Sequence, residues 1–323
     1  MLHFGAIFLF FITSLNAFAV TKARPVFLAC ARALTEKNSW SAEARPIFDL
    51  FDSGKSGWDI AEKMRSHGIK SEKERFGIAM LIAGSRDAGG VAKFIKNFDI
   101  RSADLRYQLA LKAAVNDGGA VSRYLNRFNI RGVAKLFEVA KACAVDNGIS
   151  IGAGIRNFHF KSERMRFEVA KAAAQSEQQG WDVLVHIANY QIKNQDWLKE
   201  IALLAVNSSA YSSRWKLPGV GLKRVADRIE VLRAIIERKE SVSLILDEFK
   251  IDDEKIRLEY AYADAATDPM LFAQNIGVFR LSRESDRFDL AKKVFKWNTA
   301  NETQFMARRP ESYTLLSKFD LSE

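Results

Sequence analysis

The sequence is poor in the residues that build disulfide frameworks, metal sites and proline-rich chains. Its 323 residues include only 2 cysteines, 5 prolines and 4 histidines. Two cysteines cannot form a disulfide scaffold or a cysteine-ligated zinc site, and so few prolines exclude a collagen-like chain. No histidine has a second histidine or a cysteine at the spacing of metal ligands. We therefore expect neither a metal ion nor another cofactor.

Acidic residues are outnumbered by basic ones. Asp and Glu total 39 against 49 Lys and Arg, which gives a formal net charge of +10. A hydrophobic content of 48% with 27% charged residues is typical of a folded globular chain and excludes general disorder. The positive excess favours an acidic partner. We expect a protein or another polyanionic macromolecule, and nucleic acid belongs to that class.

Charged side chains are missing from the first nineteen residues. The segment from Phe4 to Leu15 is almost wholly apolar, and Ala17-Phe18-Ala19 forms a small-x-small cleavage site. This apolar run is shorter than the roughly 20 residues of a membrane-spanning helix but fits a secretory signal. We predict a cleaved signal peptide at 1–19, a periplasmic or secreted protein, and no membrane span after cleavage. An uncleaved N-terminal membrane anchor is the alternative.

One pattern recurs at a nearly constant interval between positions 56 and 296. Each unit contains an apolar anchor residue with another apolar residue five positions before it. The anchors are Ile69, Ile100, Ile130, Phe160, Ile192, Ile251 and Leu281. The interval between Ile192 and Ile251 is twice the usual one, so it predicts one degenerate unit, within 207–250.

The residues after each anchor have a helical pattern. In several units an aromatic residue is followed three positions later by alanine, as in Phe76 and Ala79, which places both on one helical face directed inward. Ser71, Ser102 and Ser162 are positioned to cap these helices, and Ser71 with Glu74 predicts a capping box. Each unit therefore predicts a helix of about 13–15 residues, a short loop and a second helix of about 10.

Such a helical pair cannot bury its apolar face alone, so the units must stack. We predict an all-α fold, a right-handed α-solenoid of about seven to eight hairpins, each about 30 residues long. Residues 20–55 and 297–323 are predicted to cap its two ends. The array resembles the broad helical-repeat class that includes HEAT and tetratricopeptide proteins, although it lacks the tetratricopeptide Trp/Gly/Tyr pattern.

A short segment of the degenerate unit resembles the helix-hairpin-helix DNA-binding motif over residues 217–229. It reads Leu217-Pro218-Gly219-Val220-Gly221, followed by basic residues. The resemblance implies a tight hairpin whose backbone N–H groups bind phosphate at a helix start, with Lys223 and Arg224 adding contacts that do not depend on sequence. The alternative interpretation is that Pro218-Gly219 forms a simple turn between two helices.

Lys223 matches the lysine of helix-hairpin-helix glycosylases that cleave the DNA backbone. The aspartate that those enzymes carry further along the chain is replaced by Ser241, which excludes that activity. The surrounding segment breaks the repeat, and function tends to lie where a repeat breaks its rule. The candidate binding residues here are Arg214, Trp215, Gly219, Gly221, Lys223 and Arg224.

An arginine recurs six residues after the anchor in five units. These residues are Arg75, Arg106, Arg166, Arg257 and Arg287. In a stacked array they would align along one face, where they could form a positive stripe for an acidic partner. They could instead bind carbonyl or carboxylate groups of the neighbouring repeat.

These observations predict a non-catalytic, exported helical-repeat scaffold that binds a macromolecular, acidic partner along its concave face. A nucleic-acid-binding protein that uses the 217–229 hairpin is one alternative. A cell-wall-associated enzyme built on a helical superhelix is another. We find no separate catalytic domain in the sequence, and no pattern that nominates a buried catalytic glutamate.

Overall fold

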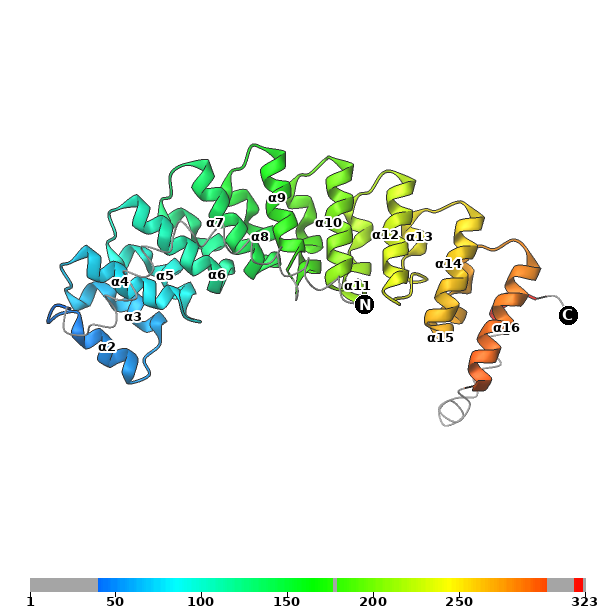
Figure 1. Ribbon diagram of the computed structural model, residues 1–323, viewed down its shortest axis with the longest axis horizontal. Helices are drawn as coiled ribbons and strands as arrows, with labels where there is room; N and C mark the ends of the chain where they lie inside the picture. The colour runs from blue at the N-terminus through cyan, green and yellow to red at the C-terminus, as the bar shows by residue number, and fades with distance from the viewer. Residues whose placement is uncertain (1–39, 177–178, 301–316, 322–323) are drawn as a thin grey trace, which may run out of the picture. The chain divides into compact units, whose positions relative to one another are not determined.

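The computed structural model describes residues 40–176, 179–300 and 317–321. The predicted signal peptide (1–19) and most of both predicted caps lie outside these residues. Within them every regular element is a helix, which confirms the all-α prediction (Figure 1). No helix in this part of the chain is long and apolar enough to cross a membrane.

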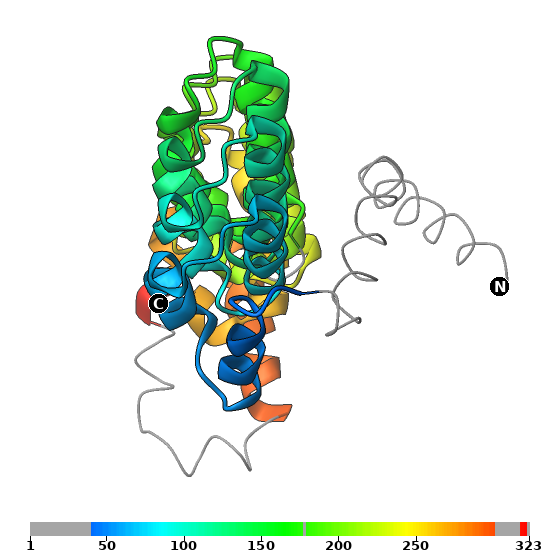
Figure 2. The same ribbon diagram turned by 90° about the vertical axis from the view of Figure 1, so that its left-hand side faces the viewer.

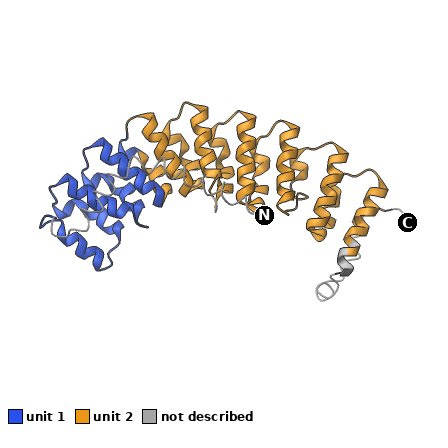
Figure 3. Ribbon diagram, in the orientation of Figure 1, with its two compact units in different colours: residues 1–116, 126–130 blue, residues 117–125, 131–323 orange. Residues whose placement is uncertain are grey.

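The chain divides into two compact units (Figure 3). Unit 1 contains the described residues up to Asn116 together with Asn126–Ile130, and unit 2 contains Asp117–Leu125 and the residues from Arg131 onward. The boundary falls inside α6 (Ala103–Phe128), where Asp117 has φ −157° and ψ 71°. Because these angles are not helical, α6 consists of two helices joined at a kink.

Unit 1 consists of alternating longer and shorter helices. The longer α4 (Glu72–Ala83) packs between shorter partners, and the shorter helices continue into single 3₁₀ turns. Figure 2 turns this unit toward the viewer and shows its two layers as two columns of ribbons. The other elements are α2 (Arg45–Asp52), α3 (Gly57–Lys63), η2 (Met64–His67), α5 (Ala88–Phe94) and η3 (Ile95–Phe98).

Unit 2 repeats the same alternation. Its longer helices pack each against the next, in the order α7 (Val133–Asp146), α9 (Glu163–Ala174), α10 (Gln195–Ser208), α12 (Val225–Glu237), α14 (Glu254–Thr267) and α16 (Glu284–Ala300). Between them lie the shorter elements α8 (Gly148–Gly154), η4 (Ile155–Phe158), η5 (Gly180–Tyr190), α11 (Ala210–Arg214), η6 (Leu217–Val220), α13 (Leu246–Phe249), α15 (Pro269–Gln274) and η7 (Ile276–Phe279), and η8 (Ser317–Phe319) follows α16.

The predicted inward alanines form the core of both units. Each is at most 5% exposed: Ala79, Ala110, Ala140, Ala170, Ala202, Ala261 and Ala291. A methyl side chain lets neighbouring helices approach closely, which explains why alanine recurs there. The aromatic position is less uniform, because Phe76 is 4% exposed whereas Phe288 is 48% exposed. Phe288 lies on α16, the last long helix described, so no further long helix in this part of the chain covers it.

The predicted serine caps are confirmed. The hydroxyl oxygens of Ser71, Ser102 and Ser162 each accept a hydrogen bond from the backbone N–H three residues later. The second half of the predicted capping box, a hydrogen bond from the Ser71 N–H to Glu74, is wrong. The carboxylate of Glu74 does not return to Ser71 but accepts from the N–H and the hydroxyl of Ser41, at 2.6 and 2.9 Å. A tertiary partner has therefore replaced the local one.

The helical pairs end in the same tight turn. A 3₁₀ turn or short helix end is followed by one residue in the left-handed region, with φ between 46° and 78°, and then by the anchor, which is buried in every unit except at the half-buried Ile130. The left-handed residues are Gly68, Asp99, Asn129, His159, Gln191, Gly221, Lys250 and Arg280. Gly221 precedes Leu222, which lies midway along the chain between the anchors Ile192 and Ile251. Leu222 is therefore the anchor that the sequence pattern missed.

Gly118 is a position where a side chain has no room. A Cβ atom there would lie 2.6 Å from the carbonyl oxygen and 2.7 Å from the Cα of Cys143. We expect Gly118→Ala to lower the free energy of unfolding by about 2–3 kcal/mol, since backbone must move. Gly219→Ala is the matched control, because nothing lies within 4 Å of a Cβ atom at Gly219. Urea unfolding measures both, and equal effects would contradict the close packing.

Candidate functional site

The recurring arginines hold consecutive turns together. The Arg75 guanidinium donates to the carbonyls of Ile69 and Lys70 in the turn before its helix, at 2.8 and 2.7 Å. It also donates to the carbonyls of Phe98 and Asp99 in the following turn, at 2.7 and 3.0 Å. One side chain therefore satisfies four backbone acceptors, and it is only 11% exposed.

The same clamp recurs at the other predicted arginines. Each donates to the turn before its helix, and Arg106 and Arg166 also donate through Nε to the carbonyl two residues before the next anchor. Arg287 donates through Nε to the Phe319 carbonyl in η8. Arg257 reaches the next turn through a longer bond of 3.5 Å to Arg280. Arg228 holds the equivalent position after Leu222 and donates to the carbonyls of Leu222 and Lys223. A partner at these arginines would have to compete with the backbone.

The helix-hairpin-helix-like segment coincides with the repeat's own turn. Leu217–Val220 forms the 3₁₀ turn, and Gly221 adopts the left-handed conformation that Asp99 and His159 adopt elsewhere. The resemblance therefore has an explanation within the repeat. Gly219 itself is exposed and unobstructed.

The backbone N–H most suited to a phosphate after this turn already has an acceptor. The Lys223 N–H donates to Oε1 of Gln195 at 2.6 Å. Side chains at the same place in other units do the same for the next turn: Glu72 accepts from Arg101 and Ser102, Glu163 from Lys193 and Asn194, and Glu254 from Ser282. These hydrogen bonds from backbone N–H groups lower the pKa of Glu163, since they favour its ionised form.

The two basic residues after the turn have different environments. The Arg224 guanidinium forms ion pairs with Asp196 and Asp227, and the hydrogen bond to Asp196 lowers the pKa of that aspartate. The side chain of Lys223 is exposed. Only Lys223 of this pair therefore presents its charge without an acidic partner in the described part of the chain.

The remaining two predicted residues, Arg214 and Trp215, lie together with Tyr211 at the surface of unit 2. Arg214 is buried, at 6% exposure, yet its guanidinium lies 4.6 Å from the ring centre of Tyr211 and 5.0 Å from that of Trp215. Both rings are largely exposed, at 59% and 50%. We call Tyr211, Arg214 and Trp215 the aromatic surface. Its rings cover a fixed cation, so their positions are held by cation–π contacts.

Polar residues replace core residues beneath the aromatic surface. At the position of Arg214 the other units carry uncharged residues, which are Leu184 and the small residues Ala61, Ala92, Ser122, Gly152, Ser243 and Ala273. At the position of Ser213 they carry buried apolar residues such as Val91 and Ile151. Arg214 donates to Glu240 at 3.2 Å and to the Ser241 carbonyl at 3.5 Å, whereas its Nε and the Ser213 hydroxyl have no partner.

These contacts lead into a buried polar cluster around Asp264. Its carboxylate accepts from the Val242 N–H and the Ser241 hydroxyl, both at 2.8 Å. Ser241 and Ser243 exchange a further hydrogen bond at 2.8 Å. Asp264 is fully buried, and this burial raises its pKa. The sequence analysis missed Asp264, although the repeat contains the signal, because the equivalent positions are apolar: Ile82, Ala113, Cys143, Ala173, Ala205 and Ile235.

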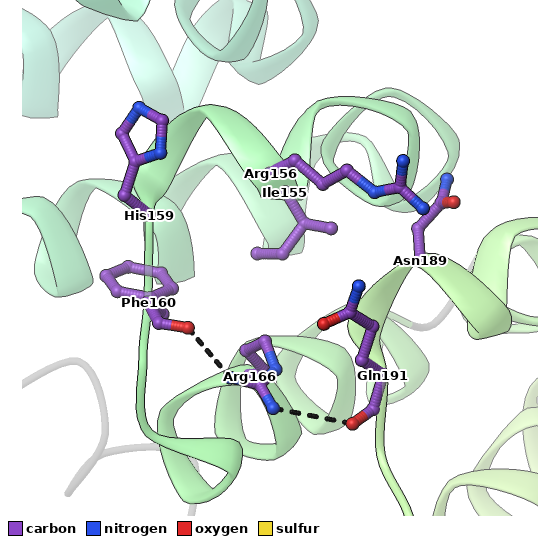
Figure 4. A pocket seen from close by; sticks show the side chains of 7 residues that line it. All are labelled: Ile155, Arg156, His159, Phe160, Arg166, Asn189 and Gln191. Carbon is purple, nitrogen blue, oxygen red and sulfur yellow. Dashed lines mark hydrogen bonds between the residues drawn. The ribbon is translucent and has the colours of Figure 1, made fainter.

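A small pocket lies between two consecutive turns of unit 2 (Figure 4). Its volume is about 160 Å³, below the 300–1,000 Å³ typical of small-molecule sites, by a factor of about two or more. Arg156 reaches across it toward Asn189, while His159 points away, so the two do not converge (Figure 4). Arg166 is held by the carbonyls of Phe160 and Gln191. The pocket is therefore a gap between repeats lined by one clamp arginine.

The comparisons with known proteins add no relative. No protein-family model, no curated protein and no solved structure matches the chain. In the ranges that the structure describes, no three His, Cys, Asp or Glu side chains are grouped so that they could hold a metal ion.

Proposed function

We propose that the chain is a helical-repeat solenoid, right-handed and built of hairpins of about 30 residues, that serves as a binding scaffold. The recurring left-handed turns and the arginine clamps support this proposal, because both join one helical pair to the next. A stacked array presents a long surface and has no need of a deep pocket. Export from the cell remains a prediction that rests on residues 1–19.

The aromatic surface is the proposed contact for a macromolecular partner. The observation that carries this proposal is the pair of exposed rings fixed over the buried Arg214. Tyrosine and tryptophan lose little side-chain entropy on binding and dominate the energy of many interfaces, particularly where they are already ordered. Lys216 and Lys223 are exposed in the same turn region and favour a partner with acidic groups around an apolar centre.

Truncating both rings should abolish binding of that partner. The double variant Tyr211→Ala/Trp215→Ala removes the exposed contact area, and we expect the affinity to fall by about a hundredfold or more. The measurement is quantitative cross-linking and affinity capture with the full chain from its native compartment, followed by titration of each captured protein. Phe288→Ala is the matched control, since Phe288 is an exposed aromatic residue, 48% accessible, on another helix.

Two outcomes would overturn this proposal. One is that the same proteins are captured with equal affinity by the wild type and the double variant. The other is that Phe288→Ala loses them to the same extent, which would indicate general stickiness of exposed rings. If the wild type and the double variant bind duplex DNA equally well, with an affinity that falls steeply as salt is added, the nucleic-acid alternative would be supported instead.

A further inference from the structure

Unit 1 carries a group of basic side chains along its successive turns. We define the basic row as Arg65, Lys93, Lys96 and Arg127. These residues belong to turns that contact each other. Arg65 donates through Nη2 to the Lys96 carbonyl at 3.0 Å, and Arg127 donates through Nη1 to the Lys93 carbonyl. Both arginine guanidinium groups therefore lie against the segment that carries Lys93 and Lys96, so the four basic residues belong to adjoining turns of unit 1.

The basic row presents its charges at the surface. Arg65, Lys96 and Arg127 are exposed, and Lys93 is half-buried. Among the described residues, Arg65, Lys93 and Lys96 form no ion pair. Arg65 uses one guanidinium N–H on the Lys96 carbonyl, which fixes its orientation and leaves other donors of the planar fork for an incoming oxyanion.

Lys93 is oriented by aromatic contacts. Its ammonium lies 5.0 Å from the ring centre of Trp58 and 5.1 Å from that of Phe94. The two rings pack edge to face, 5.6 Å apart, and both are half-buried. Because both rings are half-buried and contact this cation, they leave less ring surface for the base stacking that single-stranded nucleic acid requires.

Acidic residues interrupt the positive surface. Glu62 is exposed, and its carbonyl accepts from the Asn97 side chain next to Lys96. Asp99, also exposed, lies 3.5 Å from Arg75 and 3.9 Å from Arg101. The two arginines balance the charge of Asp99, whereas a phosphate backbone, with its uniform negative charge, would be repelled at Glu62. A polypeptide can place a neutral or basic residue opposite an acidic side chain and carboxylates opposite the basic ones. A surface of mixed charge therefore favours a polypeptide over a phosphate backbone.

We propose that unit 1 binds an acidic polypeptide segment along the basic row, with carboxylates paired to Arg65, Lys93, Lys96 and Arg127. This inference does not depend on the aromatic surface of unit 2. Neighbouring helices lie about 8–10 Å apart, so three successive turns span about 20 Å. An extended segment of about six to eight residues covers that distance.

The test uses the full chain and a defined probe. The probe is a fluorescein-labelled peptide of about twelve residues that alternates glutamate and glycine, long enough to cover the basic row when extended. Anisotropy at low salt should show saturable binding to the wild type. We expect Arg65→Glu/Lys96→Glu to weaken it by about tenfold or more, because two attractions become repulsions. The milder Arg65→Gln/Lys96→Gln should weaken it by a smaller factor.

The matched control is Lys55→Glu/Arg86→Glu, which changes the net charge equally. Both control residues are exposed in loops at the other end of the helical pairs, away from the turns. This control should bind the peptide within about twofold of the wild type. Circular dichroism melting establishes that each variant is folded.

Three results would overturn the proposal. The first is that the wild type binds no peptide at low salt, and the second is that the control variant loses as much affinity as the basic-row variant. The third is that a DNA duplex or phosphatidylserine vesicles bind with the same affinity and the same sensitivity to Arg65→Glu/Lys96→Glu. The aromatic-surface variant Tyr211→Ala/Trp215→Ala should still bind the peptide. Peptide binding therefore tests the basic row alone, and the capture experiment tests the aromatic surface alone.

Discussion

Replacing Arg75 by leucine should lower the free energy of unfolding by about 2–4 kcal/mol. The guanidinium donates to four carbonyls in two consecutive turns, and the side chain is only 11% exposed. Leucine removes every one of these donors and leaves the carbonyls partly shielded from water. The loss should appear as an earlier urea midpoint with an unchanged denaturant slope, because the same surface is exposed on unfolding.

Leucine is chosen so that the variant tests the hydrogen bonds of Arg75 and not the fit of its side chain. Leu136 and Leu198 occupy the same position in two other units, so the side chain itself is compatible with the fold. Arg86→Leu is the control, since Arg86 is exposed in the loop after α4. We expect it to change stability by less than about 0.5 kcal/mol. An Arg75→Leu variant as stable as the Arg86→Leu variant would contradict the clamp.

The repeat could be predicted because its physical causes are local. Anchors recur at a nearly constant interval because the helical pairs have nearly the same length. Alanine recurs because its small side chain lets helices pack closely, as at the fully buried Ala79 and Ala170. Serine caps depend on the next three residues of the chain. All of these signals are contained within one unit and need no knowledge of its neighbours.

Other features could not be predicted because they depend on contacts between units. The arginine register was visible, but the choice between a binding stripe and a structural clamp depends on carbonyls of the following turn, such as those of Phe98 and Asp99 for Arg75. The capping box failed because Ser41, 33 residues before Glu74, takes the carboxylate. Leu222 was missed because its turn has Val220 where most other turns have an aromatic residue, and because Pro218 and Gly219 precede it.

The candidate binding residues illustrate the same limit. Arg214 was predicted as part of a basic surface, yet it is buried under Tyr211 and Trp215 and paired with Glu240. Its charge therefore serves to hold two rings. The equivalent positions of the other units do carry the signal, because all of them are uncharged and only this one is an arginine. What these positions cannot give is the direction of the side chain, which Ser241 and Glu240 determine.

Asp264→Ala should be about as damaging as loss of the arginine clamp. The carboxylate accepts from the Val242 N–H and the Ser241 hydroxyl at 2.8 Å in a fully buried position. Alanine leaves both donors without an acceptor, and each unsatisfied buried group costs about 1–3 kcal/mol. We therefore expect a loss of about 2–4 kcal/mol in urea unfolding. Asp264→Asn should lose far less, because its amide oxygen can accept from Val242 and its NH₂ can donate to Ser241.

The same pair of variants predicts a pH dependence with a definite sign. Burial raises the pKa of Asp264 above its ordinary value, so the folded protein holds this proton more tightly than the unfolded chain does. The stabilising contribution is complete below the ordinary aspartate pKa of about 3.9 and is lost as the pH rises through the raised folded pKa. The stability of the wild type minus that of Asp264→Asn should therefore fall as the pH increases over this window.

Glu254 provides the control of opposite sign. Hydrogen bonds from the hydroxyl and N–H of Ser282 lower the pKa of Glu254, so its contribution is present above the unfolded pKa and is lost as the pH falls. The stability of the wild type minus that of Glu254→Gln should rise with pH until it levels off above the ordinary glutamate pKa of about 4.3, whereas the Asp264 difference falls above about 3.9. Urea unfolding of the three chains at a series of pH values measures both differences. Parallel slopes would contradict the buried cluster, because an aspartate that reached solvent would titrate as an ordinary surface carboxylate.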